Sequence, residues 1–338
     1  MTNRIRSRVV AGAKIVILAA IVAFVSWKLY AAWQEVGAAQ LRASIDIDWR
    51  WALLPLLGFS GILFTSATAW IWLLRHTDSA GSLVQLYGAY FFSQMGKYVP
   101  GKITLLLMRL ERTRRVGVGG YAVSVSTILE NATYMISGAA VGVLVLLRFA
   151  VARNGPSYLW LVVIVSASIL MLLTAIHPSG LYRFVNPVLR KFGRPEIAPD
   201  QRLSMRTLLM SSLMMLPCWL FGGFTLWATV RCLMPVPVTH YWGLVSAFAL
   251  SVLAGMVSFL PGGLGIREVV QGVFLLPVVS MSIVPADASQ AKAQLIVTLA
   301  VVLLRVLQIA AEAGLGLLGG LLTASSMEGS QLQKQGKG

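Results

Sequence analysis

Long apolar runs dominate the sequence and restrict the folds that it can adopt. Three of them carry no charged residue and are each about as long as the 20 residues that cross a bilayer core: Trp51–Leu74, Tyr158–Ile176 and Leu208–Val230. Only 12% of the 338 residues are charged and 57% are hydrophobic, whereas a soluble domain is about 25% charged. The sequence therefore predicts an all-α polytopic membrane protein with short loops.

Three further runs are long enough to span a membrane although they contain ionisable residues. Val9–Tyr30 follows a basic N-terminus, which we interpret as the start of an uncleaved first span. Tyr121–Leu147 and Ala293–Leu322 hold acidic or basic residues within an otherwise apolar stretch. These runs bring the expected number of full spans to about six.

Two other apolar segments, Leu83–Met108 and Trp242–Leu276, are each interrupted near the middle by a Pro-Gly pair. Proline breaks a helix and glycine permits the turn that follows. Irregular backbone at membrane depth persists only where protein or water covers it, so the breaks predict a cavity or a packed interior. The predicted hinge residues are Pro100, Gly101, Pro261, Gly262 and Gly263.

The distribution of basic residues suggests how these two segments enter the membrane. If both crossed fully, the basic clusters of 109–115 and 183–206 would lie outside, against the positive-inside tendency. Re-entrant hairpins return both clusters to the cytoplasm, together with the N- and C-termini. Half-helices of about 14 residues would also be too short to span. We therefore expect two opposed hairpins in an inverted repeat, an arrangement found in many transporters.

This topology predicts a single membrane domain over residues 1–323, followed by a short polar tail, 324–338. Its first half covers about 1–176 and its second half about 207–323, with a basic cytoplasmic loop at 177–206 between them. Membrane topology alone accounts for the charge of that loop. The alternative is a surface that docks a partner or binds anionic lipid.

Ionisable residues at membrane depth cost about 2.5–3.5 kcal/mol each and are often functional. In this chain the cations outnumber the anions near the two breaks, which suits an anionic headgroup such as phosphate. Backbone N–H groups of the half-helices that follow Gly101 and Gly263 would add donors. The predicted headgroup ligands are Lys97, Lys102, Arg109, Arg267 and Arg305.

Polar residues also recur on single helical faces, which should point into the interior. Glu130 and Tyr134 share one face, and Arg305, Gln308 and Glu312 share another. We predict that the cavity is lined by Glu130, Tyr134, Glu268, Gln308 and Glu312.

Internal ion pairs are the alternative to a binding site. Glu130 could pair with Arg305 or Lys97, and Glu268 with Arg267 or Arg305. Lys102 and Arg109 could instead anchor the chain at the membrane interface.

Signatures of enzymes and of nucleotide binding are missing from the sequence. The histidines His76, His177 and His240 lie at the edges of predicted spans and match no metal-binding spacing. We expect no metal, no cofactor and no catalytic activity. The net charge of +16 is explained by lipid headgroups, so no nucleic-acid partner is expected.

The motifs at the two breaks resemble those of a known family. "GKYVPGKI" followed by Arg109 and Glu130, and then "SFLPGGLGIREVV", is similar to the lysylphosphatidylglycerol synthase transmembrane-region family over about residues 10–322. Many members have an arginine close to the acidic residue, where this chain has Asn131. The resemblance implies a flippase-like protein that moves a lipid or lipid-linked molecule. Aminoacyl-lipid synthesis is not implied, because it belongs to a separate soluble domain of the synthases.

The preferred functional hypothesis is a flippase-like transporter of the bacterial inner membrane. Its ligand would be an anionic phospholipid or a lipid-linked sugar. One alternative is an intramembrane transferase acting on lipid-linked substrates, with Glu130 as the candidate base. The other is a scaffold that does not transport and that binds a glycosyltransferase or lipid synthase.

Overall fold

The computed structural model describes residues 48–78, 80–98, 103–151, 177–191, 193, 195–199, 202–258, 261–263, 265–282 and 290–335. Every regular element within these ranges is a helix, which confirms the predicted all-α class. The predicted spans Val9–Tyr30 and Tyr158–Ile176 lie outside the described residues, as do Pro100, Gly101 and Lys102.

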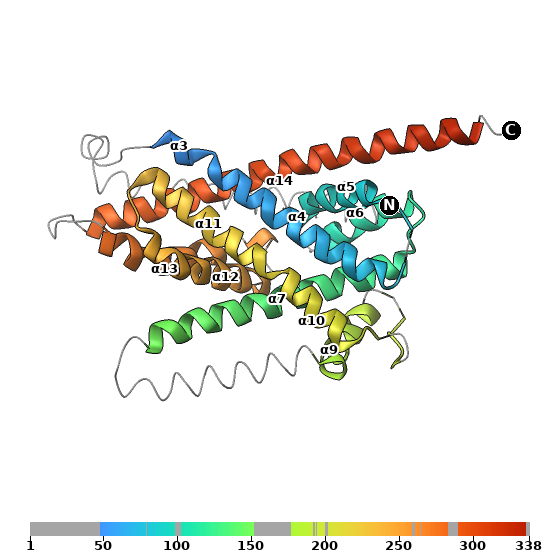
Figure 1. The fold of residues 1–338 in the computed structure, drawn as a ribbon, viewed down its shortest axis with the longest axis horizontal. Helices are drawn as coiled ribbons and strands as arrows, with labels where there is room; N and C mark the ends of the chain where they lie inside the picture. The colour runs from blue at the N-terminus through green and yellow to red at the C-terminus, as the bar shows by residue number, and fades with distance from the viewer. Residues whose placement is uncertain are drawn as a thin grey trace, which may run out of the picture.

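The helices follow one another along the chain in the order shown in Figure 1. In the first part they are α3 (Trp49–Ala52), α4 (Leu54–Arg75), α5 (Leu83–Gln94), the 3-10 helix η1 (Met95–Tyr98), α6 (Ile103–Arg114) and α7 (Gly120–Val151). In the second part they are α9 (Pro178–Lys191), α10 (Met205–Met214), α11 (Leu216–Leu233), η3 (Val238–His240), α12 (Tyr241–Val257), η4 (Pro261–Gly263), α13 (Ile266–Ser282) and α14 (Gln290–Gln335).

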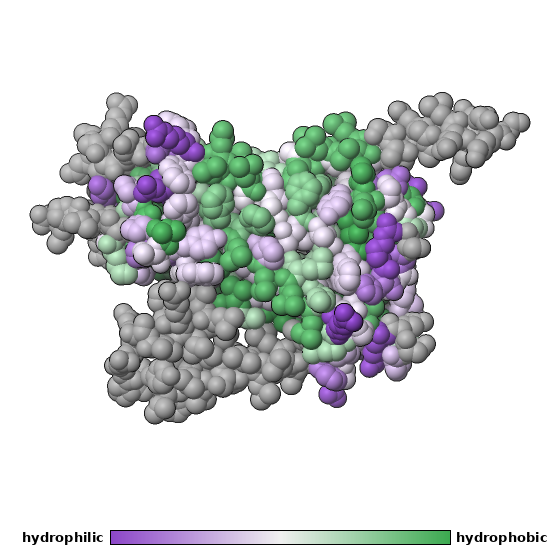
Figure 2. Space-filling view, viewed as in Figure 1, coloured by the Kyte–Doolittle hydropathy of each residue, from purple (hydrophilic) through white to green (hydrophobic). Residues whose placement is uncertain are grey.

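Four helical stretches are long and apolar enough to cross a membrane. They are Trp49–Arg75, Met205–Leu233, Val238–Val257 and Lys292–Thr323. Three of these contain spans that the apolar runs predict. On the face drawn in Figure 2, hydrophobic side chains cover the middle and hydrophilic ones gather mainly toward the two ends. These features identify a multi-pass membrane protein.

The helices of the two interrupted segments fold into hairpins. α5 packs on α6, and α12 packs on α13. The hairpins lie on opposite sides of the molecule in Figure 1, and their breaks meet in the interior, where η1 contacts η4. At the second break Gly262 and Gly263 adopt φ angles of 59° and 70°, a conformation that favours glycine.

The lengths of the hairpin arms agree with the sequence expectation only in part. α5 and α6 have 12 residues each, but α12 and α13 have 17 each, so the expected length of about 14 residues is wrong for the second hairpin. η3 leads directly into α12 and extends that arm to a helical stretch of 20 residues. This arm is therefore as long as a full membrane span.

Helix α14 joins the two halves by packing along both hairpins and along α4. It approaches α5 closely at Gly319, where an added Cβ atom would lie 2.5 Å from the carbonyl oxygen of Gly88. Small residues allow helices in membranes to approach each other in this way. This contact fixes α14, and with it the polar side chains of its first half, against the first hairpin.

We predict that Gly319→Ala lowers the thermal midpoint of the purified protein, because overpacking of this kind costs roughly 1–3 kcal/mol. Gly314→Ala is the matched control, since a Cβ atom at Gly314 on the same helix meets nothing within 4 Å. Intrinsic tryptophan fluorescence during heating gives the measurement. Equal midpoints for the two variants would contradict the close contact.

Candidate functional site

A cavity of about 370 Å³ lies where the two hairpins meet, and α4, α7 and α14 complete its walls. Much of the wall is apolar, from side chains such as Phe59, Leu106 and Phe248. Its charged lining residues are Lys97, Arg109, Glu130, Arg267 and Glu312. The volume is within the range of ligand-binding pockets.

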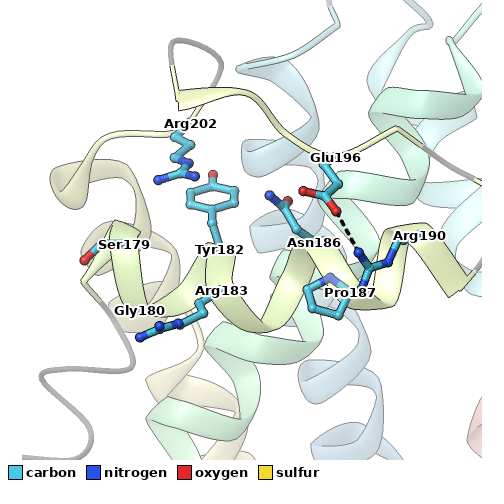
Figure 3. Close-up of a pocket in the computed structure, with 9 residues that line it drawn as sticks. All are labelled: Ser179, Gly180, Tyr182, Arg183, Asn186, Pro187, Arg190, Glu196 and Arg202. Atoms are coloured by element: carbon cyan, nitrogen blue, oxygen red, sulfur yellow. Dashed lines mark ion pairs between the residues drawn. The ribbon is translucent and has the colours of Figure 1, made fainter.

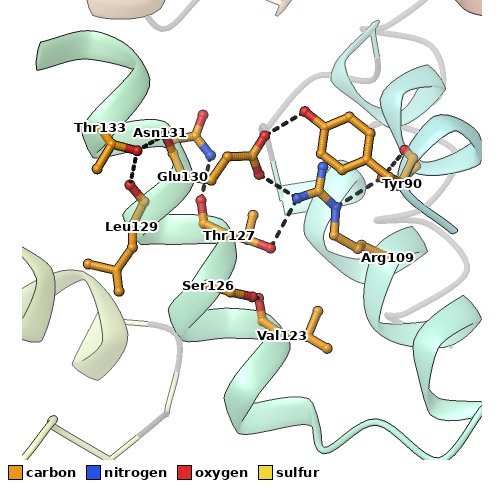
Figure 4. Close-up of polar contacts among 10 residues, drawn as sticks. Tyr90, Arg109, Val123, Ser126, Thr127, Leu129, Glu130, Asn131 and Thr133 are labelled. Carbon is orange, nitrogen blue, oxygen red and sulfur yellow. Dashed lines mark hydrogen bonds and ion pairs between the residues drawn. The ribbon is translucent and has the colours of Figure 1, made fainter. Parts of the chain in front are cut away.

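Arg109 on α6 is completely buried and forms the first polar cluster with Glu130 on α7 (Figure 4). Its Nη1 atom donates to Glu130 Oε2 at 2.6 Å and to Thr127 Oγ1 at 3.3 Å. Tyr90 OH donates to the other oxygen of Glu130 at 2.6 Å. The guanidinium also lies over the rings of Tyr90 and Trp70, at 4.2 and 4.8 Å. The structure therefore contradicts an exposed interface role for Arg109.

Glu312 on α14 is the centre of a second polar cluster, which includes side chains of η1 next to the first break. Its Oε1 atom accepts hydrogen bonds from Lys97 Nζ at 2.6 Å and from Gln308 Nε2 at 2.7 Å. Its Oε2 atom accepts one from Tyr98 OH at 2.7 Å. Three donors on one carboxylate compensate for removing its charge from water. Lys97 thus binds a carboxylate of the same chain.

Arg305, also on α14, bonds to the backbone of the second break. Its Nη2 atom donates to the carbonyl oxygen of Gly262 at 2.7 Å, and Nη1 donates to Gln308 Oε1 at 3.1 Å. Its Nε atom lies 3.1 Å from Glu268 Oε1. The other oxygen of Glu268 accepts from the backbone N–H of Gly265 at 2.6 Å, which joins the break to the start of α13.

Arg267 on α13 differs from the other cations of the cavity. It is only 8% exposed, and its guanidinium lies 5.0 Å from the centre of the Phe248 ring. Within the part of the chain that the structure describes, it forms no hydrogen bond and no ion pair. Since Lys97 and Arg109 are each paired with a glutamate, Arg267 leaves the lining with one surplus positive charge.

The structure thus brings most of the predicted site residues together around the two breaks. The alternative pairing of Glu268 with Arg305 is confirmed. The pairings of Glu130 with Arg305 or with Lys97 are wrong. Glu130 pairs with Arg109, and Lys97 pairs with Glu312. Tyr134 lines the cavity and packs on Trp219 with ring centres 4.4 Å apart. Asn131, next to Glu130, donates to the carbonyl oxygen of Thr127. Whether these side chains bind a ligand stays a prediction.

Sequence reasoning missed Tyr90, Gln94 and Tyr98, which lie in the first interrupted segment. Tyr90, Gln94 and Lys97 are spaced i, i+4 and i+7, so they follow one helical face. The same i, i+4 spacing links Glu130 and Tyr134, so it would have identified Tyr90 and Gln94 as members of a polar face. Among the described residues, no three His, Cys, Asp or Glu side chains form a cluster that could hold a metal ion.

We predict that Arg109→Gln lowers the free energy of unfolding by about 3–5 kcal/mol, because it leaves the Glu130 carboxylate buried without its cation. The double variant R109Q/E130Q should lose less than R109Q. The control is Arg115→Gln, since the pair between Arg115 and Glu111 is 47% and 59% exposed and such pairs contribute about 0–1 kcal/mol. Denaturant titration in detergent measures each value, and equal losses for R109Q and R115Q would contradict the buried pair.

Comparison with known proteins agrees with the architecture. The sequence model of one family, described as the transmembrane region of lysylphosphatidylglycerol synthase, matches residues 12–304. The match includes α3 to α13, both breaks and the first part of α14. A search of curated proteins found no match.

Proposed function

Since the chain belongs to the lysylphosphatidylglycerol synthase transmembrane-region family, we propose that it moves an anionic lipid, or a lipid-linked glycan intermediate, between leaflets. The membrane is the bacterial inner membrane, with both termini in the cytoplasm. In this proposal the chain is a transporter and not an enzyme. It acts on a phospholipid or lipid-linked sugar and needs no cofactor.

The observation that carries the proposal is the unpaired guanidinium of Arg267. A buried cation without a counter-charge is costly, and buried charges are usually paired. A phosphate or phosphodiester would supply the missing anion and could accept two parallel hydrogen bonds from one arginine. The apolar part of the wall, including Phe248, suits the region where a headgroup joins its hydrocarbon chains.

The meeting of the two breaks supports a transport route. In the proposed arrangement the hairpins are re-entrant, come from opposite sides of the membrane and form an inverted repeat. Each hairpin would separate the cavity from one side. Gly262 and Gly263 would act as the hinge of the second hairpin, because their backbone conformation is open to few other residues.

The transferase alternative receives less support from the site. Both carboxylate oxygens of Glu130 accept short hydrogen bonds, one from Arg109 and one from Tyr90. A carboxylate held in this way is a weak candidate for a general base, which must reach the proton of its substrate. Glu130 therefore fits a structural role better than a catalytic one.

We predict that Arg267→Gln reduces lipid translocation in proteoliposomes at least tenfold, because it removes the only unpaired cation of the described lining while keeping the amide donors. The assay follows a fluorescent anionic phospholipid, and in parallel a polyprenyl-phosphate sugar, as each becomes accessible in the other leaflet. Arg115→Gln, at an exposed position directly after α6, should translocate at the wild-type rate.

Two outcomes would contradict the proposal. One is an R267Q variant as active as R115Q. The other is a wild-type protein that moves no member of an anionic lipid panel faster than empty vesicles do. In the second case, co-purification of a glycosyltransferase or lipid synthase whose activity survives R267Q would favour the scaffold.

We expect Lys97→Ala to abolish transport for a different reason. It leaves Glu312 without its cation, so the first break should loosen and the thermal midpoint should fall together with activity. R267Q should reduce activity while keeping the midpoint within a few degrees of wild type. A K97A protein with unchanged stability and transport would show that the pair between Lys97 and Glu312 is needed for neither.

A further inference from the structure

A second cavity, of about 510 Å³, lies beside helix α9 and shares no lining residue with the central one. Figure 3 shows arginine side chains around it from α9 and from the chain that returns toward α10. Its charged lining residues are Arg183, Arg190, Glu196 and Arg202. This set carries a net charge of +2, so the cavity suits an anion.

Helix α9 presents three different faces. Leu181, Tyr182, Val185 and Leu189 are buried in a core cluster with side chains of α4, α7 and α10. A second face carries the cavity residues Ser179, Arg183, Asn186 and Arg190, which are spaced i, i+4, i+7 and i+11. The third face is apolar and exposed: Phe184 is 71% exposed and Val188 is 39% exposed.

Hydrogen bonds fix the opposite wall of the α9 cavity. Asn186 exchanges two bonds with the backbone of Ile197, at 3.1 and 3.3 Å. Tyr182 OH accepts from the backbone N–H of Leu203 at 2.9 Å. The returning chain is therefore held against α9, and Arg202 is placed over the Tyr182 ring at 5.5 Å.

The three arginines of the α9 cavity differ in whether they form an ion pair. Arg190 lies 3.5 Å from Glu196 in an exposed pair. Arg183 and Arg202 form no ion pair within the described residues, and Arg202 Nε is buried there without a hydrogen-bond partner. Two guanidinium groups thus remain for a ligand, and arginine is suited to bidentate binding of phosphate.

We propose that the α9 cavity binds the phosphate of an anionic phospholipid from the adjacent leaflet, with Arg183 and Arg202 as its ligands. A lipid fits better than free phosphate because the exposed apolar face begins at Phe184, the residue after Arg183. Phe184 and Val188 would enter the acyl layer while the arginines hold the headgroup, as in interfacial amphipathic helices. This site is separate from the proposed transport route and does not depend on it.

Native mass spectrometry of the full-length protein in detergent tests the proposal. The probes are phosphatidylglycerol, phosphatidylcholine with the same acyl chains, and inorganic phosphate. Removing both arginines in R183Q/R202Q should weaken phosphatidylglycerol binding about tenfold or more. The reason is that each basic residue near an anionic surface raises the affinity about fivefold. Phosphatidylcholine carries the same phosphate but also a quaternary ammonium group, so its binding should be weaker in the wild type and should fall less in the double variant.

Arg206→Gln is the matched control, because Arg206 is exposed, follows the same chain segment and does not line the cavity. It should change phosphatidylglycerol binding less than threefold. Each comparison is repeated in an R267Q background, where the central cavity has lost its unpaired cation. The effect of R183Q/R202Q should persist there, which separates this site from the transport proposal.

Equal losses for R206Q and R183Q/R202Q would overturn the proposal, because general surface charge would then explain the binding. Inorganic phosphate that displaces phosphatidylglycerol at equal concentration would also overturn the lipid assignment, and Phe184→Ser with unchanged affinity would do the same. If R202Q lowers the thermal midpoint, R183Q alone supplies the test, since Arg183 is exposed; an unchanged affinity in R183Q would then count against the site.

Discussion

Two helix breaks meet inside the protein, and the rest of the structure depends on how the polar and charged groups at these breaks are paired. Helix α14 supplies hydrogen-bonding partners for both breaks. Arg305 binds the carbonyl oxygen of Gly262 at the second break, and Glu312 binds Lys97 and Tyr98 at the first. One helix therefore holds both breaks together, and the cavity forms where they meet.

This arrangement also explains the charge balance of the interior. The polar groups that stabilise the breaks and the α6–α7 contact are paired cation to anion, as buried charges require. Arg267 is the exception among the described residues of the cavity wall. In the proposed function, the ion pairs therefore stabilise the hairpins and the surplus cation binds the ligand.

The sequence predicted the elements better than their partners. Apolar runs located α4, α10–α11 and α14, because each run is long and uniform enough to exceed the length of a bilayer core. Pro-Gly pairs located both breaks for local steric reasons. Pairing could not be predicted in the same way, because Lys97 and Glu312 are 215 positions apart and the choice of partner depends on how α14 packs. The same applies to Arg109, whose burial follows from the approach of α6 to α7.

An experimental density map of the wild-type protein in nanodiscs that contain anionic phospholipid would test the role of Arg267 most directly. We expect headgroup density in the central cavity, with a phosphate within hydrogen-bonding distance of the Arg267 guanidinium and Lys97 still bound to Glu312. A map in which Arg267 pairs with a carboxylate of the protein, and in which the cavity holds no headgroup, would contradict this role.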